Sequence, residues 1–410
     1  MALVPLNCLS LAPLCGFPNA LPPLTYRLFL VRSLPVSPAV DLLRQLVQCE
    51  TCDPPGREIE IATLVHERLT AAGLESTLDE FAPGRANVIG RVKGAGNCPA
   101  IVMSAHFDTM PPGTKPWEHD PFTAEIVDGK LYGRGAADMK SGMAAMIVAA
   151  ERIAAGGDRL GGDVVLAFSA GESSNCLGAK RMVETGALEG AGVILVSEPS
   201  SMDVLLAEKG ALWVRLIAHG KAGHRSGAAG DVGGGNNAID RMLDALMALR
   251  SFTFDVPDHP LLGEPTINVG KVNGGMVVNL TADRCEAEVD IRPLPGMDPA
   301  EVERAILAHV GSDLDLERID YKPPVETSAD HPFAEICLGV TSDVQGAKAE
   351  PRGASYYSDA TVLTPAFDLP MVIIGPGPLG MSGQTDEYVE TAAVDQAVEV
   401  FERVAREWLD

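Results

Sequence analysis

The sequence contains no run of about 20 apolar residues, the length that a helix needs to cross a bilayer. Positive charge is also scarce, because 32 Lys and Arg stand against 56 Asp and Glu and leave a net charge of -24. A field of that sign repels polyanions, which argues against nucleic acid and anionic membranes as partners. Eight cysteines in 410 residues are too few for a disulfide framework. We therefore expect reduced thiols and a cytoplasmic protein.

The first 36 residues differ in composition from the rest of the chain. They are rich in Leu, Pro and Cys and contain no Lys or Arg before Arg27. A secretory signal usually begins with a basic segment, so we expect a disordered extension over residues 1–36, with a targeting segment or a non-native upstream start as alternatives. Cys49 and Cys52 form a single CxxC without a second pair, for which we expect ordinary packing.

Short apolar segments alternate with helical patterns from Ser37 onward. The expected strands cover residues 100–104, 163–169, 192–196 and 370–375, and an Ala-rich buried helix is expected over 143–155. Strands and helices that alternate in this way predict an α/β fold, with a mostly parallel sheet flanked by helices.

The pattern changes between residues 211 and 320. It predicts a strand at 212–218, a helix at 237–250, strands at 266–272 and 284–291, a helix at 299–310 and a last strand near Leu316. This β-α-β-β-α-β order is typical of a ferredoxin-like α+β domain. The chain is thus predicted to divide into the extension 1–36, a catalytic domain formed by 37–210 and 321–410, and an inserted domain at 211–320.

Polar residues that follow apolar strands are the candidates for chemistry, because ligands gather at the carboxyl ends of parallel strands. His106 and Asp108 follow the first predicted strand at a spacing that lets the carboxylate orient the imidazole. Asp138 precedes the buried helix, and Glu172 and Glu198 follow two further strands. One imidazole and several carboxylates are the groups that a divalent metal and a general base require.

At these residues the sequence resembles the two-metal deacetylase and carboxypeptidase family that includes acetylornithine deacetylase, succinyl-diaminopimelate desuccinylase, aminoacylase and carboxypeptidase G. The resemblance covers roughly residues 37–410 and has several separate motifs in the expected order. The matching segments are residues 104–108, 133–140 (Gly-Arg-Gly-Ala-Ala-Asp-Met-Lys), 198–199, 220–239 around His224, 290–292, 375–377 and 386–388.

The resemblance implies a role for each of these site residues. His106 and Glu198 would bind one metal, Asp138 would bridge two metals, Asp108 would orient His106, and Glu172 would act as general base. The expected cofactor is a divalent metal, with zinc as the first expectation and cobalt or manganese as alternatives.

The sequence departs from the family at both protein ligands that belong only to the second metal. Where the family usually carries Asp-Glu-Glu, this chain has Gly-Glu-Ser, so that Ser173 replaces the ligand. Gly383 stands where the family has a His, and the chain has no His beyond residue 331. Gln384 or Asp386 is the alternative ligand. We therefore expect one metal per subunit.

The resemblance also assigns residues to the substrate and to a partner subunit. His224 would reach the active site of the partner and stabilise the oxyanion, which implies a homodimer formed through the inserted domain. Arg292 and Asn279 would bind a substrate carboxylate, for which a guanidinium is well shaped. The expected ligand is an acylated amino acid or a short peptide-like acid.

The sequence thus predicts a metal-dependent amidohydrolase or peptidase that uses one retained metal site, with Glu172 as general base. Two alternatives stay open at this point. The same fold can carry a non-hydrolytic acyl transfer, condensation or isomerisation, or it can be a catalytically silent carboxylate-binding homologue.

Overall fold

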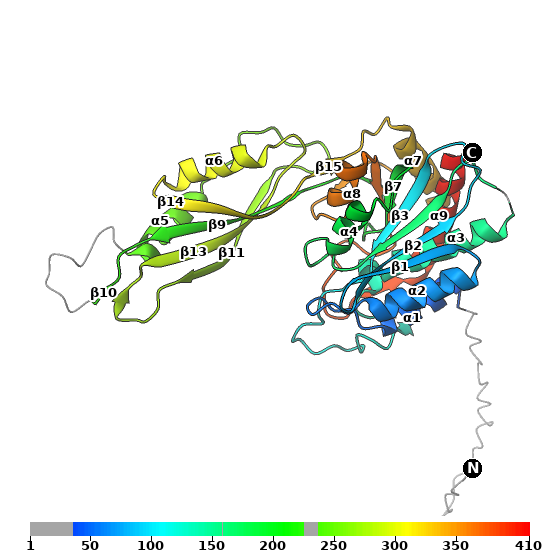
Figure 1. Ribbon diagram of the computed structural model, residues 1–410, viewed down its shortest axis with the longest axis horizontal. Coiled ribbons are helices and arrows are strands. Elements are labelled where there is room, and N and C mark those ends of the chain that lie inside the picture. The colour runs from blue at the N-terminus through cyan, green and yellow to red at the C-terminus, as the bar shows by residue number, and fades with distance from the viewer. Residues whose placement is uncertain (1–35, 158, 225–236) are drawn as a thin grey trace, which may run out of the picture. The chain divides into compact units, whose positions relative to one another are not determined.

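A computed structural model describes residues 36–157, 159–224 and 237–410 (Figure 1). The predicted extension therefore lies outside the described residues, except for Val36. Residues 37–410 form one compact unit. Among the described helices, none is both long enough and apolar enough to cross a membrane. The helices are α1 (Pro38–Gln48), α2 (Ile59–Ala71), α3 (Ser141–Ala155), α4 (Leu177–Thr185), α5 (Ala238–Leu249), α6 (Pro299–Val310), α7 (Pro332–Gln345), α8 (Ala360–Phe367) and α9 (Thr391–Leu409).

A nine-stranded sheet is the centre of the larger core. Its order is β1-β2-β6-β3-β7-β17-β8-β15, and β16 pairs with β8. Strands β6, β3, β7 and β17 are parallel to one another, whereas β1, β2 and β15 join antiparallel. The strands are β1 (Glu75–Ala82), β2 (Arg85–Val92), β3 (Ala100–His106), β6 (Val164–Ser169), β7 (Ala191–Val196), β8 (Leu205–Glu208), β15 (Val325–Glu326), β16 (Arg352–Ala354) and β17 (Met371–Ile373).

The parallel strands are mostly apolar, as expected for strands that helices cover on both faces. Every residue of β3 and β6 is buried, as expected for strands with both faces packed. Helix α3 is also buried along nearly its whole length and packs against both of these strands and against α9. Helices α4 and α8 pack against each other and contact β6 and β7 respectively. The predicted α/β class with a mostly parallel sheet is confirmed.

A second sheet is formed between residues 211 and 322. Its antiparallel order is β11-β13-β9-β14, and α5 and α6 pack against it around a separate apolar core. This is the strand order of a ferredoxin-like β-α-β-β-α-β unit. The division of the chain into domains at residues 37, 211 and 321 stays a prediction. The strands are β9 (Ala211–His219), β11 (Thr266–Gly274), β13 (Arg284–Arg292) and β14 (Leu314–Lys322).

Two small sheets complete the described structure. In one of them, β18 pairs with β5. This pairing places the C-terminal segment beside the strands that precede the helical turn at Ala136–Lys140. The strands are β4 (Glu125–Val127), β5 (Lys130–Tyr132) and β18 (Tyr388–Glu390) in one sheet, and β10 (Gly223–His224) and β12 (Leu280–Thr281) in the other.

Cys49 and Cys52, the CxxC pair, are free thiols.

Candidate active site

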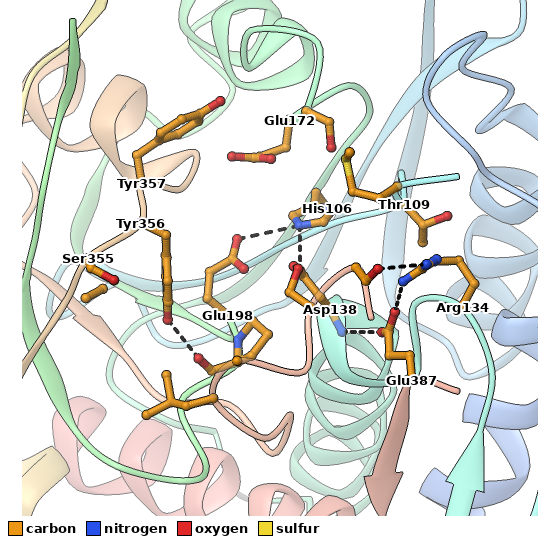
Figure 2. A pocket seen from close by; sticks show the side chains of 18 of the residues that line it. His106, Thr109, Arg134, Asp138, Glu172, Glu198, Ser355, Tyr356, Tyr357 and Glu387 are labelled. Atoms are coloured by element: carbon orange, nitrogen blue, oxygen red, sulfur yellow. Dashed lines mark hydrogen bonds and ion pairs between the residues drawn. The ribbon is translucent and has the colours of Figure 1, made fainter. Parts of the chain in front are cut away.

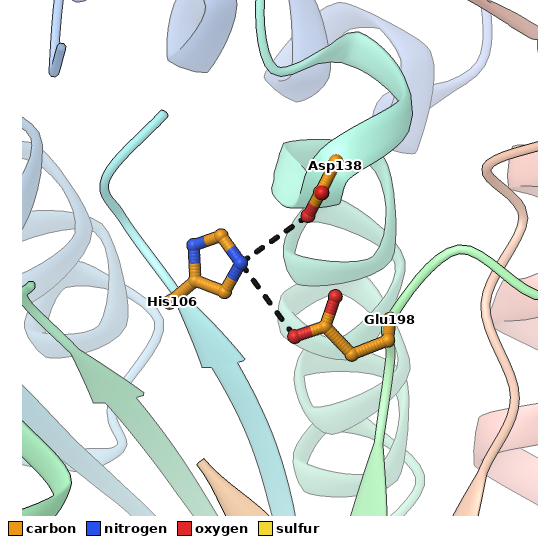
Figure 3. A group of neighbouring side chains, drawn as sticks. All are labelled: His106, Asp138 and Glu198. Atoms are coloured by element: carbon orange, nitrogen blue, oxygen red, sulfur yellow. Dashed lines mark ion pairs between the residues drawn. The ribbon is translucent and has the colours of Figure 1, made fainter. Parts of the chain in front are cut away.

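Three side chains converge at the carboxyl ends of two neighbouring strands of the large sheet. His106 is the last residue of β3, Glu198 follows β7, and Asp138 lies in the helical turn Ala136–Lys140 that leads into α3. The Nε2 atom of His106 is 3.2 Å from Asp138 Oδ1 and 3.6 Å from Glu198 Oε1 (Figure 3). One ligand atom from each residue lies within 4.8 Å of the others. The structure therefore brings together the three predicted ligands of the first metal.

The charges around His106 fit a cation. Burial lowers the pKa of His106, but the nearby carboxylates of Glu198, Asp108 and Asp138 outweigh burial and raise it well above its ordinary value. Burial raises the pKa of Asp138, yet its interaction with the nearby His106 imidazole brings it below its ordinary value. The imidazole is thus surrounded by three carboxylates, an excess of negative charge that favours a positive partner. A divalent cation would supply that positive charge, with the ligating imidazole neutral.

The donor set also fits a catalytic metal. One imidazole nitrogen and two carboxylates resemble the three-ligand sets that leave a coordination position open on zinc. Oδ1 of Asp138 is buried, and its contact with His106 Nε2 at 3.2 Å lacks the geometry of a full hydrogen bond in the part of the chain that the structure describes. A buried oxygen of this kind is costly unless something pairs with it. A divalent cation would satisfy it.

Asp108 supports the site with a different atom from the predicted one. His106 Nδ1 lies 2.9 Å from the backbone carbonyl of Asp108, whereas the carboxylate is 3.7 Å away. The carboxylate instead accepts hydrogen bonds from three backbone N–H groups, those of Gly171 (2.8 Å), Glu172 (3.0 Å) and Ser173 (2.9 Å). Three charge-assisted bonds outweigh one bond to an imidazole. The carboxylate therefore fixes the segment that carries Glu172, and the carbonyl orients His106.

Glu172 lies immediately after a turn that requires glycine. Gly171 has φ 73, and a Cβ at this position would lie 2.4 Å from Arg85 Nη1. Burial raises the pKa of Glu172 well above its ordinary value, and the charge of His106 only partly opposes this shift. Figure 2 shows Glu172 at the pocket beside His106. A carboxylate with a raised pKa close to the candidate ligands is suited to accept and return a proton.

The three candidate ligands and Glu172 line a pocket of about 460 Å³. One part of its wall is aromatic: Tyr356 and Tyr357 follow β16, and the hydroxyl of Tyr356 donates to the carbonyl of Pro199 at 2.8 Å (Figure 2). The lining consists of His106, Thr109, Met110, Arg134, Asp138, Glu172, Ser173, Glu198, Pro199, residues 353–357, Leu379, Gly380, Ser382, Gly383 and Glu387.

The pocket includes both positions at which the sequence departs from the two-metal pattern. Ser173 and Gly383 line it, and Gly383 has φ 72, a backbone conformation that a His would adopt only with strain. The alternative ligand Asp386 is used elsewhere, because its Oδ1 accepts from the backbone N–H groups of Glu118 (2.8 Å) and His119 (3.1 Å). Among the described residues, neither Asp386 nor Gln384 belongs to the pocket lining.

The predicted substrate residues lie outside the pocket lining. Arg292 ends β13, pairs with Asp290 at 3.1 Å, and its Cζ lies 5.3 Å from the ring centre of Tyr357, which does line the pocket. Asn279 is exposed. His224 belongs to the short strand β10, where it is opposite Leu280, and its side chain lies outside what the structure describes.

Two further pairs in the site were not predicted from the sequence. Arg134 forms a buried ion pair with Glu387. Both residues belong to segments that match the family, and this was the only sign in the sequence that either of them is part of the site. Ser382 donates a hydrogen bond to Asp138 Oδ2. No spacing or motif signals this contact, because 244 residues separate the two partners.

Comparisons with known proteins identify the family to which the chain belongs. Residues 102–407 match the model of peptidase family M20/M25/M40. Among solved structures, the aminopeptidase PepT of Bacillus cereus is 20% identical, with 91% of this chain and 99% of that chain covered and a TM-score of 0.73. The carboxypeptidase Sso-CP2 of Sulfolobus solfataricus is 17% identical, with 90% and 99% covered and a TM-score of 0.75.

A third similar structure is described as a dinuclear metal-binding peptidase. This is the YxeP protein of Bacillus subtilis, which is 16% identical, with 90% of this chain and 97% of that chain covered and a TM-score of 0.70. At these identities the structural likeness shows the fold, and the family match covers most of the chain. The resemblance found in the sequence is confirmed, and the chain belongs to peptidase family M20/M25/M40.

Proposed function

We propose that this protein is a metal-dependent amidohydrolase that cleaves the amide of an N-acyl amino acid or a dipeptide-like acid with one divalent cation per subunit. The observation that carries the proposal is the convergence of His106, Asp138 and Glu198 at one pocket with the half-buried Glu172. His106, Asp138 and Glu198 would hold the cation. Nitrogen and oxygen donors of this kind favour zinc, with cobalt and manganese as alternatives.

A cation in this site would supply Lewis acidity for the amide carbonyl and for the attacking water. Glu172 accepts a proton from that water while its oxygen adds to the carbonyl carbon. The same carboxyl then donates the proton to the departing nitrogen as the C–N bond breaks, which yields a free amine and a carboxylic acid. The raised pKa of Glu172 favours both transfers, because the group must exchange a proton near neutral pH.

Asp108 keeps Glu172 in position for these transfers. Its carboxylate accepts from three consecutive N–H groups, and one of them belongs to Glu172 itself. The Tyr356 hydroxyl remains protonated, because burial raises its pKa well above the ordinary value, and it holds the residue that follows Glu198. The geometry of the base and of one ligand is therefore set before substrate arrives.

The substrate proposal is an acid, for which Arg292 is the proposed anchor. Its guanidinium lies over the ring of Tyr357, and Tyr357 lines the pocket. Asn279 would assist it, and His224 of the partner subunit would stabilise the oxyanion. The relatives named above as an aminopeptidase and a carboxypeptidase support a substrate of peptide-like size.

The second sheet supports the proposed homodimer. Strand β11 pairs only with β13 in the described part of the chain, and nearly all its residues are exposed. Helix α5, which packs on the same sheet, exposes Leu243 (54%) and Met247 (63%) one turn apart. An edge strand with one free side, and exposed apolar side chains on a helix of the same domain, are features with which a second copy can pair. Sedimentation equilibrium of the full chain and of a Leu243→Glu/Met247→Glu variant tests this, since a dimer that persists in the variant contradicts it.

Loss of both exclusive ligands of a second metal also favours a second candidate function, an acyl transfer, condensation or isomerisation without net hydrolysis. The experiment that separates the two is a screen of N-acyl amino acids and dipeptides with the zinc-loaded protein, followed by detection of the free amine and of any condensed product. Hydrolysis that disappears in Glu172→Gln supports the proposed function. A condensed product without free amine supports the second candidate. Binding of these acids without any turnover supports the third alternative, a catalytically silent carboxylate-binding homologue.

A further inference from the structure

The two carboxylate oxygens of Asp138 have different neighbours. Oδ1 lies 3.2 Å from His106 Nε2, on the side where the first cation is proposed to bind. Oδ2 accepts a hydrogen bond from the hydroxyl of Ser382. An aspartate that bridges two cations must offer one oxygen to each of them. Here the second oxygen already has a donor.

Ser382 belongs to a segment that the site fixes from several directions. It immediately precedes Gly383, whose carbonyl accepts a hydrogen bond from Arg134 Nη2 at 3.2 Å. The same Arg134 pairs with Glu387, and Glu387 Oε1 accepts from the backbone N–H of Asp138 at 3.1 Å. The backbone on both sides of the Ser382–Asp138 contact is therefore held by one set of buried polar groups.

We propose that Ser382 is a positioning residue that takes the place of the second cation on Asp138. Its hydroxyl fixes the carboxylate so that Oδ1 points toward the single cation held with His106 and Glu198, and it occupies the oxygen that a second cation would need. This inference rests on the proposed one-metal function. It explains how Asp138 can keep a fixed orientation although Ser173 and Gly383 cannot hold a second ion.

The loss of zinc affinity expected when the Ser382 hydroxyl is removed depends on how exposed Ser382 is. Hydrogen-bond partners of metal ligands contribute roughly 10- to 100-fold to metal affinity. Ser382 is exposed to solvent, so water can partly replace its hydroxyl in a variant. We therefore expect the lower end of that range, about tenfold.

The test is calorimetric titration of the metal-stripped full chain with zinc. Ser382→Ala should bind zinc about tenfold more weakly than the wild type, whereas Ser382→Thr, which keeps the hydroxyl, should restore the wild-type dissociation constant. Ser355→Ala is the control, because Ser355 lines the same pocket on the side of Tyr356 (Figure 2). It should bind zinc as the wild type does. Thermal unfolding of each metal-free variant checks that all of them fold.

The inference on Ser382 and the proposed function fail in different ways. One equivalent of zinc in the wild type with an unchanged dissociation constant in Ser382→Ala overturns the role of Ser382 and leaves the one-metal site standing. The expected weakening without any turnover of acyl amino acids overturns hydrolysis and supports Ser382. Two equivalents, or none, in the wild type contradict both.

Discussion

The Arg134 guanidinium and the Glu387 carboxylate form a buried ion pair, with Nη1 and Oε2 2.5 Å apart. Each side chain is 1% exposed. Oε1 of Glu387 also accepts from the backbone N–H groups of Ala137 (2.9 Å) and Asp138 (3.1 Å). The pair thus links the C-terminal segment to the turn that positions a metal ligand. Burial raises the pKa of Glu387 to about 7, although the charge of Arg134 opposes that shift.

Arg134→Met is predicted to destabilise the fold because it leaves the Glu387 carboxylate buried without its cation. Removal of one partner of a buried pair costs about 3–5 kcal/mol of unfolding free energy. Urea unfolding of the metal-free wild type and variant measures this loss of unfolding free energy. Arg152→Met is the matched control, since Arg152 is 52% exposed and its pair with Glu402 spans 3.7 Å. We expect a loss below about 1 kcal/mol there. Equal losses in both variants would contradict the structural role of the buried pair.

Asp108→Asn is predicted to impair turnover more than metal binding. The amide cannot accept from all three N–H groups, so the segment carrying Glu172 loses its anchor, while the carbonyl that orients His106 is unchanged. We expect kcat to fall roughly 100-fold, as for a displaced catalytic group, and the zinc dissociation constant to stay close to that of the wild type. If zinc affinity falls as much as kcat, the carboxylate orients His106 after all.

Glu208 is predicted to make stability depend on pH. It is fully buried, its Oε2 accepts from Ser358 at 2.9 Å, and burial raises its pKa to about 8. Between roughly pH 4.5 and pH 8 the folded state keeps a proton that the unfolded state has lost, so unfolding free energy falls as pH rises through this window. Glu208→Gln should remove this contribution. The measurement is the difference in unfolding free energy between variant and wild type at pH 5 and at pH 8. A difference that is the same at both pH values would refute the predicted contribution of Glu208.

Glu172→Gln is predicted to lower kcat by roughly 10²- to 10⁴-fold, the usual contribution of a general base. Glutamine has nearly the same shape but cannot take a proton. Zinc stoichiometry should remain that of the wild type, because Glu172 does not belong to the ligand group. Steady-state kinetics and metal analysis of the same preparation test both statements. A variant with wild-type kcat would remove Glu172 from the mechanism.

The parallel part of the fold was predictable because its strands are apolar on both faces. The expected strand at 100–104 and the observed β3 (Ala100–His106) begin at the same residue, and the buried helix α3 was also expected. Strand β1 was missed, since Glu75–Ala82 is mostly polar and half-exposed and has no clear apolar alternation. Its pairing with β2 depends on neighbours distant in sequence.

The candidate ligands were predictable because His106 and Glu198 follow apolar segments and Asp138 precedes the buried helix. His106, Asp138 and Glu198 are indicated by position, and the structure adds only their distances. Contacts made by segments without a pattern were not predictable. Ser382 reaches Asp138 across 244 residues, and the atom by which Asp108 supports His106 depends on three N–H groups that only the folded loop brings together.

The number of tightly bound metal ions is the central quantity. The full chain is loaded with excess zinc, passed through a desalting column, and analysed by plasma mass spectrometry against protein concentration. The retained set His106, Asp138 and Glu198, together with Ser173 and Gly383 at the second position, predicts one equivalent of zinc per chain, and His106→Ala should lose it. Two equivalents that survive desalting would contradict the one-metal account.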